Sequence, residues 1–393
     1  MKHKDIYLAS KPRYEILDGL RGVAALMVIF FHCFETYIPK FGTQHINHGY
    51  LAVDFFFMLS GFVIGYAYQD RWNRMSTWNF FKRRLIRLHP MVIAGTLIGV
   101  CLFFFGESAF FPQIAKCEPW KFFLCLFLAL LMIPAGPSLD IRGWQEFNSF
   151  NGPNWSLTFE YIGNILYALV LRHLPTAVLG ALCTGSIFFT LDMALGWDVF
   201  NLFTQPKYNV IGGWSLTPDQ LYIGFGRLFY PFLCGLLISR ILSKRTPKGN
   251  PSSNPFELRG GFWWASAILV VLFAMPQIGG KPGVADGLYQ VIAIVLIFPI
   301  VVLIGAGSKT TDAKSAKWCE FLGQLSYPLY IVHFPFMYMQ MTWAFNHPQA
   351  PAWQHIVLNI GIVLMSIAIA WACLKLYDEP VRAWLKNKLY TKK

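Results

Sequence analysis

Two ionisable residues, Arg21 and His32, interrupt an apolar stretch of the sequence that is long enough to cross a bilayer. At about 100° per residue, the eleven steps between them close almost three helical turns, so both side chains project from one face, roughly 16 Å apart. Asp18 and Glu35 extend the same face. Ionisable side chains inside a membrane span cost on the order of 3 kcal/mol each on insertion scales and usually face the protein interior. We therefore expect this first helix to carry functional side chains.

His32 is suited to general-base chemistry, because imidazole can take a proton from a hydroxyl near neutral pH. Glu35 follows three residues later on the same helix face, where its carboxylate can bond the other ring nitrogen and stabilise an imidazolium. The alternative is a histidine that only packs between helices, bonded to a hydroxyl or a carbonyl. Spacing alone leaves both interpretations open.

Basic residues form a second set that can bind phosphate. Arg83, Arg84 and Arg87 precede the third apolar stretch, and Arg84 and Arg87 share a helix face. Such a cluster fits the phosphates of a nucleotide-bearing donor such as coenzyme A, although anionic lipid or membrane topology also explains it. Arg21 can likewise hold phosphate, or it can be an interfacial anchor paired with Asp18.

Single polar side chains mark three further apolar stretches. Ser60 lies beside glycines whose four-residue spacing also fits helix packing. Glu160 needs a partner inside the membrane and serves either as a second acid or base or as the partner of a basic residue such as Arg227. His333 lies near the middle of a late apolar stretch, where a structural role is the ordinary expectation.

The composition requires a membrane protein. Of the 393 residues, 55% are hydrophobic and 13% are charged, and the mean hydropathy is +0.44. A soluble fold could not cover so much apolar surface with so few charges. The net charge of +13 comes from Lys and Arg clustered in particular connections, as the positive-inside rule predicts, so no nucleic-acid partner is expected. We predict no structural disulfide among the eight cysteines and no metal site.

The expected fold is all-helical, a polytopic membrane protein with ten transmembrane helices and both termini cytoplasmic. Ten spans place every basic connection inside the cell. The apolar stretch at 120–136 has a core of about 14 residues ended by prolines and a glycine, so we expect a re-entrant or interfacial helix there. We expect residues 1–393 to form a single membrane domain with no appended soluble domain. The expected spans are 16–36, 50–68, 88–106, 155–171, 176–195, 220–240, 262–279, 287–305, 319–341 and 354–376.

Seven motifs in order along nearly the whole chain resemble the acyltransferase 3 family of integral-membrane O-acyltransferases. The most specific is an arginine followed by ten residues and a histidine, which falls on Arg21 and His32. The resemblance does not extend to the hydrolase-like domain that some members append. His89 stands where many members have tyrosine. The motifs are LDGLRGVAALMVIFFH, VDFFFMLSGFVIGY, FFKRRLIRLHP, NWSLTFE, GRLFYPFLCG, FLGQLSYPLYIVH and YDEPVRAWL.

The resemblance implies transfer of an acyl group, commonly acetyl, from acyl-CoA to a hydroxyl of a glycan such as a cell-surface polysaccharide or its lipid-linked precursor. No cofactor is bound permanently; acetyl-CoA or another acyl-CoA is the donor substrate. The expected partners are acyl-CoA, the hydroxyl-bearing acceptor and the lipid bilayer, in a bacterial inner membrane, and the sequence carries no signal for the oligomeric state. By position, the implied catalytic residues are His32, Glu35 and Glu160, the donor-binding residues are Arg21, Arg83, Arg84, Arg87 and Ser60, and Trp155 contacts the acceptor.

Under this hypothesis, the phosphates of acyl-CoA bind the arginines and the pantetheine arm follows the first helix to His32. His32 then either deprotonates the acceptor hydroxyl or carries the acyl group transiently. The rival class is a proton-coupled transporter or flippase, in which intramembrane residues such as His32, Glu160 and His333 relay protons. Aromatic side chains such as Trp155 can stack on sugar rings, or serve as interfacial anchors.

Overall fold

The computed structural model describes residues 11–37, 46–205, 207–245, 258–310 and 312–390, and in these ranges the chain is helical without a strand. Eight segments of the described chain are long and apolar enough to span a membrane. Long apolar runs form helices there because only a helix satisfies every backbone hydrogen bond within itself. The eight segments are α1 (Glu15–Glu35), the turn Gly49–Leu51 with α3 (Ala52–Tyr68), α4 (Thr77–Leu102), α7 (Thr176–Ala194), α8 (Pro218–Arg245), α9 (Gly261–Ala274) with the turn after it, α10 (Val284–Ile292) with α11 (Phe298–Gly307), and α13 (Ala352–Ala372) with α14 (Glu379–Leu389).

The other two expected spans correspond to α6 (Asn154–Leu169) and α12 (Ala313–Asn346). α6 has 16 residues, which is short for a span. α12 has 34 residues, but its polar residues keep its mean hydropathy too low for it to be among the eight spanning segments. The stretch at 120–136 forms α5 (Pro119–Leu130), a helix of 12 residues. At 1.5 Å per residue it covers about 18 Å, less than the hydrocarbon core of a bilayer.

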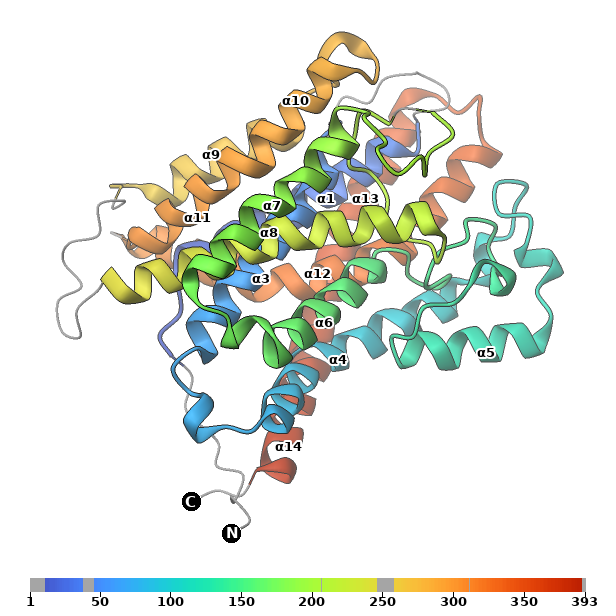
Figure 1. The fold of residues 1–393 in the computed structure, drawn as a ribbon. Coiled ribbons are helices and arrows are strands. Elements are labelled where there is room, and N and C mark those ends of the chain that lie inside the picture. Colours follow the sequence, from blue (N-terminus) through green and yellow to red (C-terminus); the bar gives the residue numbers. More distant parts are fainter. Residues whose placement is uncertain (1–10, 38–45, 206, 246–257, 311, 391–393) are drawn as a thin grey trace.

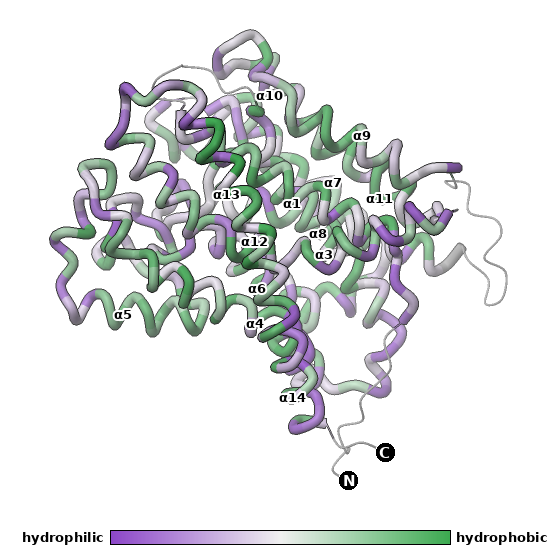
Figure 2. The backbone as a smooth tube through the Cα atoms, turned by 180° about the vertical axis from the view of Figure 1, so that it is seen from behind, coloured by the Kyte–Doolittle hydropathy of each residue, from purple (hydrophilic) through white to green (hydrophobic). Residues whose placement is uncertain are grey.

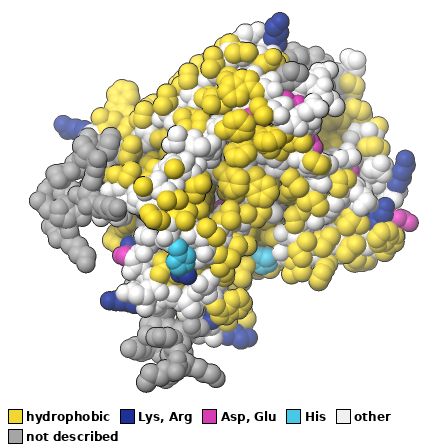
Figure 3. All heavy atoms as spheres, in the orientation of Figure 1, with side chains coloured by type: hydrophobic (Ala, Val, Ile, Leu, Met, Phe, Trp, Pro, Cys, Tyr) yellow, Lys and Arg dark blue, Asp and Glu magenta, His cyan; other side chains and the backbone are white. Residues whose placement is uncertain are grey.

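The surface of the fold is that of an integral membrane protein. Figure 3 shows apolar side chains over most of one face, and the exposed large side chains include Trp264 on α9, Leu296 in the π-helical turn between α10 and α11, and Leu364 on α13. Polar residues gather instead on α14 and the neighbouring start of α4 (Figure 2). Water would not favour so much exposed apolar surface, whereas a lipid environment does.

Two helix pairs form the centre of the molecule, α1 with α12 and α3 with α8 (Figure 1). Glycines allow the close approach of the second pair. A Cβ atom on Gly61 would collide with the carbonyl of Phe232, and one on Gly235 would collide with the carbonyl of Met58. The small-residue spacing in α3 therefore serves helix packing, as one of the two sequence interpretations proposed.

A buried ion pair joins α3 to α8. Arg227 Nη2 lies 2.7 Å from Asp54 Oδ2, and the two side chains are 2% and 1% exposed. The same nitrogen donates to the carbonyl of Tyr50 at 2.7 Å. Because both charges are removed from solvent and lipid, each depends on the other, and the pair fixes the register of the two helices.

The connection between α5 and α6, residues 131–153, folds back over α12 and buries a carboxyl group there. Glu146 Oε2 accepts a 2.6 Å hydrogen bond from the Tyr338 hydroxyl, and the Arg142 guanidinium lies 3.6 Å from the centroid of the Tyr338 ring. Burial raises the pKa of Glu146 from 4.5 to about 7, although the Tyr338 bond and Arg142 act in the opposite direction. The folded protein therefore holds this proton over a pH range in which the unfolded chain releases it.

This proton makes stability pH-dependent. Below about pH 4.5 both states are protonated, and between about 4.5 and 7 only the folded state is, so the free energy of unfolding should fall as pH rises through that window. Thermal unfolding of the wild type and Glu146→Gln from about pH 5 to about pH 8 tests this, because the variant lacks the titrating group. Glu118→Gln, on an exposed carboxylate, serves as the control and should keep the wild-type slope. The same slope in Glu146→Gln would contradict the assignment.

Candidate functional site

A cavity of about 480 Å³ opens between the start of α1, the polar ends of α3 and α4, and the junction of α13 with α14. We call it the basic cavity, because cationic side chains outnumber acidic ones around it. Its acidic residues are Asp18, Glu160, Asp378 and Glu379. Its cationic residues are Lys11, Arg13, Arg21, Arg71, Arg83, Arg84, Arg87, Arg382 and Lys386.

All four arginines that the sequence predicts as donor-binding line the basic cavity. Arg83, Arg84 and Arg87 reach it from the first turns of α4, which Ser76 caps by accepting a hydrogen bond from the backbone of Asn79. A capped amino terminus keeps the helix regular over these turns, so the three side chains leave it at fixed positions. The tertiary structure thus brings these three arginines and Arg21 to one cavity, whereas their spacing in the sequence could only suggest a shared site.

Arg21 is held at the cavity by contacts on two helices. Its Nε donates to Ser326 Oγ at 2.8 Å, and its Nη2 donates to the carbonyl of Gly323 at 3.3 Å. Asp18 Oδ1 lies 3.4 Å from the same Nη2, so the pairing with Asp18 that the alternative interpretation considered is also present. The guanidinium is therefore oriented by α12 as well as by its own helix.

Glu160 lies in the basic cavity, away from His32. Its Oε1 accepts hydrogen bonds from Arg84 Nη2 at 2.6 Å and from Ser60 Oγ at 3.0 Å. The alternative partner considered from sequence, Arg227, pairs with Asp54 instead. The structure thus places Glu160 and Ser60 among the predicted donor-binding residues and separates Glu160 from the predicted base.

Sequence reasoning missed the contribution of the two chain ends to this cavity. Arg382 and Lys386 enter from α14, and Lys11 enters from the segment before α1. Arg382 Nη2 lies 2.7 Å from Asp378 Oδ2, four residues earlier. In the sequence, Arg382 lies within the motif YDEPVRAWL and Lys386 directly follows it, and the position of these cations beside a predicted span fits the positive-inside rule as well. Tyr14 also lines the cavity, and burial raises its pKa to about 12, so it remains a neutral phenol.

His32 and Glu35 form the predicted hydrogen-bonded pair, with 2.6 Å between His32 Nδ1 and Glu35 Oε2. The His32 ring stacks on that of His333 from α12, with centroids 5.6 Å apart and planes 29° apart. Phe31 and Phe334 meet the His32 ring edge to face. We call His32 and His333 the histidine pair.

The basic cavity ends just short of the histidine pair. Its lining includes Ser156 and Tyr330, whose oxygens are 2.8 Å apart, and neither His32 nor His333. The Tyr330 ring lies 5.8 Å from the His333 ring, one helical turn further along α12. A chain that follows α1 from the cavity therefore meets Tyr330 before it reaches His32.

Trp155, the predicted acceptor contact, is 7% exposed. Its ring faces the Arg227 guanidinium at 5.2 Å, and a Cβ atom on Gly213 would collide with it. The indole therefore packs beside the α3–α8 ion pair, and its acceptor role stays a prediction.

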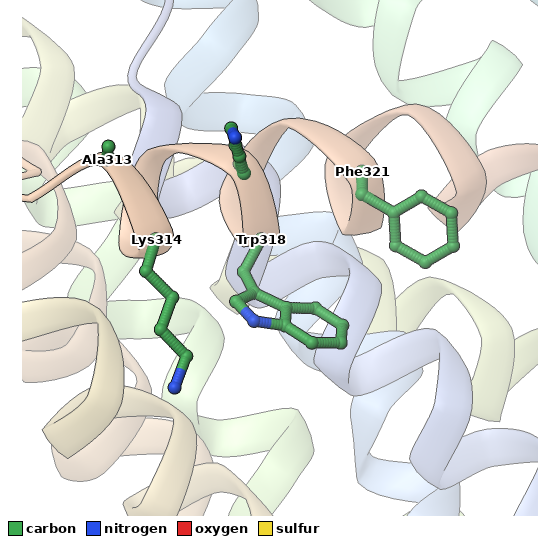
Figure 4. A pocket seen from close by; sticks show the side chains of 5 residues that line it. Ala313, Lys314, Trp318 and Phe321 are labelled. Atoms are coloured by element: carbon green, nitrogen blue, oxygen red, sulfur yellow. The ribbon is translucent and has the colours of Figure 1, made fainter.

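A second hollow, of about 560 Å³, lies on the first turns of α12 and is lined by Ala313, Lys314, Lys317, Trp318 and Phe321. Figure 4 shows Lys314 and Trp318 pointing to the same side of the helix. It contains none of the predicted site residues.

Comparison with known proteins gives matches over nearly the whole length. O-acetyltransferase OatA of Staphylococcus aureus (strain NCTC 8325 / PS 47) is 24% identical over 383 residues, which are 94% of this chain and 58% of that protein. Putative O-acetyltransferase SACOL0978 of Staphylococcus aureus (strain COL) is 23% identical over 323 residues, 81% of this chain and 50% of that protein. The chain thus spans only about half the length of these two relatives.

A shorter relative, Protein 2 in picA locus of Rhizobium radiobacter, is 36% identical over 163 residues, covering 40% of this chain and 81% of that protein. No solved structure matches the chain. Residues 14–375 match the family described as acyltransferase domain. This span includes Arg21, His32 and the arginines of α4, and the chain therefore belongs to the acyltransferase 3 family.

Proposed function

We propose that this protein is a membrane O-acetyltransferase that moves an acetyl group from acetyl-CoA to a hydroxyl of a glycan, such as a cell-surface polysaccharide or its lipid-linked precursor. The observation that carries the proposal is the closeness of two sites, since Tyr330 lines the basic cavity and its ring lies 5.8 Å from that of His333. The basic cavity suits the phosphates of coenzyme A, and beyond Tyr330 the His32 imidazole is poised as a base. The O-acetyltransferase relatives, by their names, support the same reaction.

The donor assignment follows from charge and hydrogen bonding. Coenzyme A carries a pyrophosphate and a further phosphate, and guanidinium groups bind phosphate through two parallel hydrogen bonds. Arg83, Arg84 and Arg87 leave one helix end, and Arg382 faces them from α14. We place the phosphates among these side chains and the pantetheine arm along α1. The Tyr330 contact with Ser156 must open for the thioester to reach His32.

The chemistry requires one base. A carboxylate oxygen can only accept a hydrogen bond from His32 Nδ1, so the proton is on Nδ1 and Nε2 has a free lone pair. Nε2 takes the proton of the acceptor hydroxyl as its oxygen attacks the thioester carbon. The C–O bond forms, the C–S bond breaks, and His32 returns the proton to the coenzyme A thiolate. In the second route His32 carries the acetyl group before the hydroxyl takes it.

For the topology we propose ten spans, including α6 and α12, with both chain ends at the cytoplasmic face of a bacterial inner membrane. The support is that Lys11 near one end and Lys386 near the other line the same cavity. That face must be cytoplasmic if the cavity is to meet acetyl-CoA. The cations gathered there also agree with the positive-inside rule.

Donor binding tests the proposal. Arg84→Gln and Arg382→Gln should each weaken acetyl-CoA binding by roughly 10- to 100-fold, because each removes a charge-assisted bond to phosphate. Affinity is measured with radiolabelled acetyl-CoA on protein in nanodiscs. Lys317→Gln, in the second hollow, is the matched control and should bind as the wild type does.

A second donor separates phosphate recognition from general damage. S-acetyl-pantetheine lacks the nucleotide and its phosphates, so its affinity should be the same in wild type and variants. No acetyl-CoA binding to folded wild-type protein, together with substrate-dependent proton uptake into vesicles, would contradict the proposal and favour the transporter or flippase class.

A further inference from the structure

His333 has a ring nitrogen that no described residue satisfies. Its Nδ1 lies 2.8 Å from the carbonyl oxygen of Tyr330 and 3.2 Å from that of Leu329. A carbonyl oxygen only accepts, so Nδ1 carries the proton and Nε2 is an acceptor. The residue is 0% exposed, and among the described residues nothing bonds Nε2. A buried acceptor without a donor is costly, so this nitrogen is placed to receive one.

The other member of the histidine pair has the same character. His32 Nδ1 donates to Glu35, which leaves His32 Nε2 as a second acceptor beside the first. The two ring centroids are 5.6 Å apart, so the two acceptor nitrogens are close enough for one ligand to reach both. One hydroxyl carries one hydrogen and can donate to only one of them. A single ligand that satisfies both must carry two donors.

We propose that the acceptor presents two hydroxyls on adjacent carbons, a vicinal diol, and that His333 Nε2 accepts the hydrogen bond of the hydroxyl that is not acetylated. This assignment rests on the proposed function and deepens it. His32 Nε2 takes the proton of the reacting hydroxyl, while His333 keeps its own proton on Nδ1 and only binds. Hydroxyls on adjacent ring carbons are near neighbours, so one diol can offer a hydroxyl to each imidazole.

The neighbouring residues fit a sugar ring better than an isolated alcohol. The centroids of Phe31 and Phe334 lie 5.0 and 4.8 Å from that of His32, which places apolar rings beside the two polar nitrogens. A sugar has the same combination, with C–H groups on its faces and hydroxyls at its edge. His333 thus selects polyols, because a ligand with one hydroxyl leaves a buried acceptor unpaired.

The test compares two small acceptors that differ by one hydroxyl, trans-1,2-cyclohexanediol and cyclohexanol. Protein in nanodiscs receives radiolabelled acetyl-CoA and one alcohol, and the acetyl ester is counted. We expect the wild type to acetylate the diol at least about tenfold faster. His333→Phe keeps an aromatic ring without the acceptor, so the ratio of the two rates should fall to near one. His333→Gln restores an acceptor and should recover part of the preference.

The results of these assays either support or overturn the diol assignment. Equal rates with both alcohols in the wild type would overturn the assignment, as would transfer to neither alcohol by protein that cleaves acetyl-CoA in a His32-dependent way. If His333→Phe keeps the diol preference, His333 does not bind the second hydroxyl and its role is purely structural. Acetyl-CoA binding and thermal unfolding identify a misfolded variant, in which case His333→Gln carries the test. If the wild type never cleaves acetyl-CoA, the proposed function fails and the diol assignment fails with it.

Discussion

Replacing His32 by alanine is expected to lower acetyl transfer by about 10²- to 10⁴-fold, the usual contribution of a general base, while acetyl-CoA binding stays at the wild-type level. The imidazole lies beyond Tyr330 and does not line the basic cavity, so donor affinity does not depend on it. Transfer is measured as release of the coenzyme A thiol, and affinity as binding of labelled acetyl-CoA. A covalent acetyl-histidine route predicts the same loss.

Two further variants sharpen this experiment. Glu35→Gln keeps a hydrogen-bonding partner for His32 Nδ1 but removes the charge that stabilises the imidazolium, so transfer should fall less than in the alanine variant. His347→Ala removes an exposed histidine at the end of α12 and should leave transfer unchanged. Full activity in His32→Ala would reject this residue as the base and as the acetyl carrier.

Breaking the Asp54–Arg227 pair is expected to have the largest effect on stability. Asp54→Leu leaves a cation that is 3% exposed without its partner, and losses of about 3–5 kcal/mol are typical for such a change. Because the pair joins α3 to α8, the thermal unfolding midpoint should fall sharply, measured by tryptophan fluorescence in detergent. The double variant Asp54→Leu with Arg227→Leu should recover most of the loss, since no buried charge remains.

A surface pair provides the comparison. Lys121 Nζ lies 3.8 Å from Glu118 Oε2 at the start of α5, and the two side chains are 31% and 58% exposed. Such pairs contribute about 0–1 kcal/mol, so Lys121→Ala should hardly move the midpoint. An Asp54→Leu midpoint within the range of this control would mean that the buried pair does not hold the two helices together.

The helical class of the fold could be predicted because apolar run length is a local property. Eight of the ten predicted spans are helices that can cross a membrane by length and composition, and α5 is short where the sequence favours a short helix. α6 differs because it has only 16 residues, and α12 differs because polar residues such as His333 lower its hydropathy while they face protein rather than lipid. Hydropathy measures a residue's type and not what surrounds it.

The sequence by itself determined contacts within one helix. The bond between His32 and Glu35 follows from a spacing of three residues, and the grouping of Arg84 with Arg87 follows from one helical turn. Tertiary structure alone decided the contacts between helices. It stacked His333 on His32, paired Glu160 with Arg84, and brought Arg382 from the far end of the chain into the cavity. Helical periodicity fixes which side chains share a face, but packing between helices decides what that face meets.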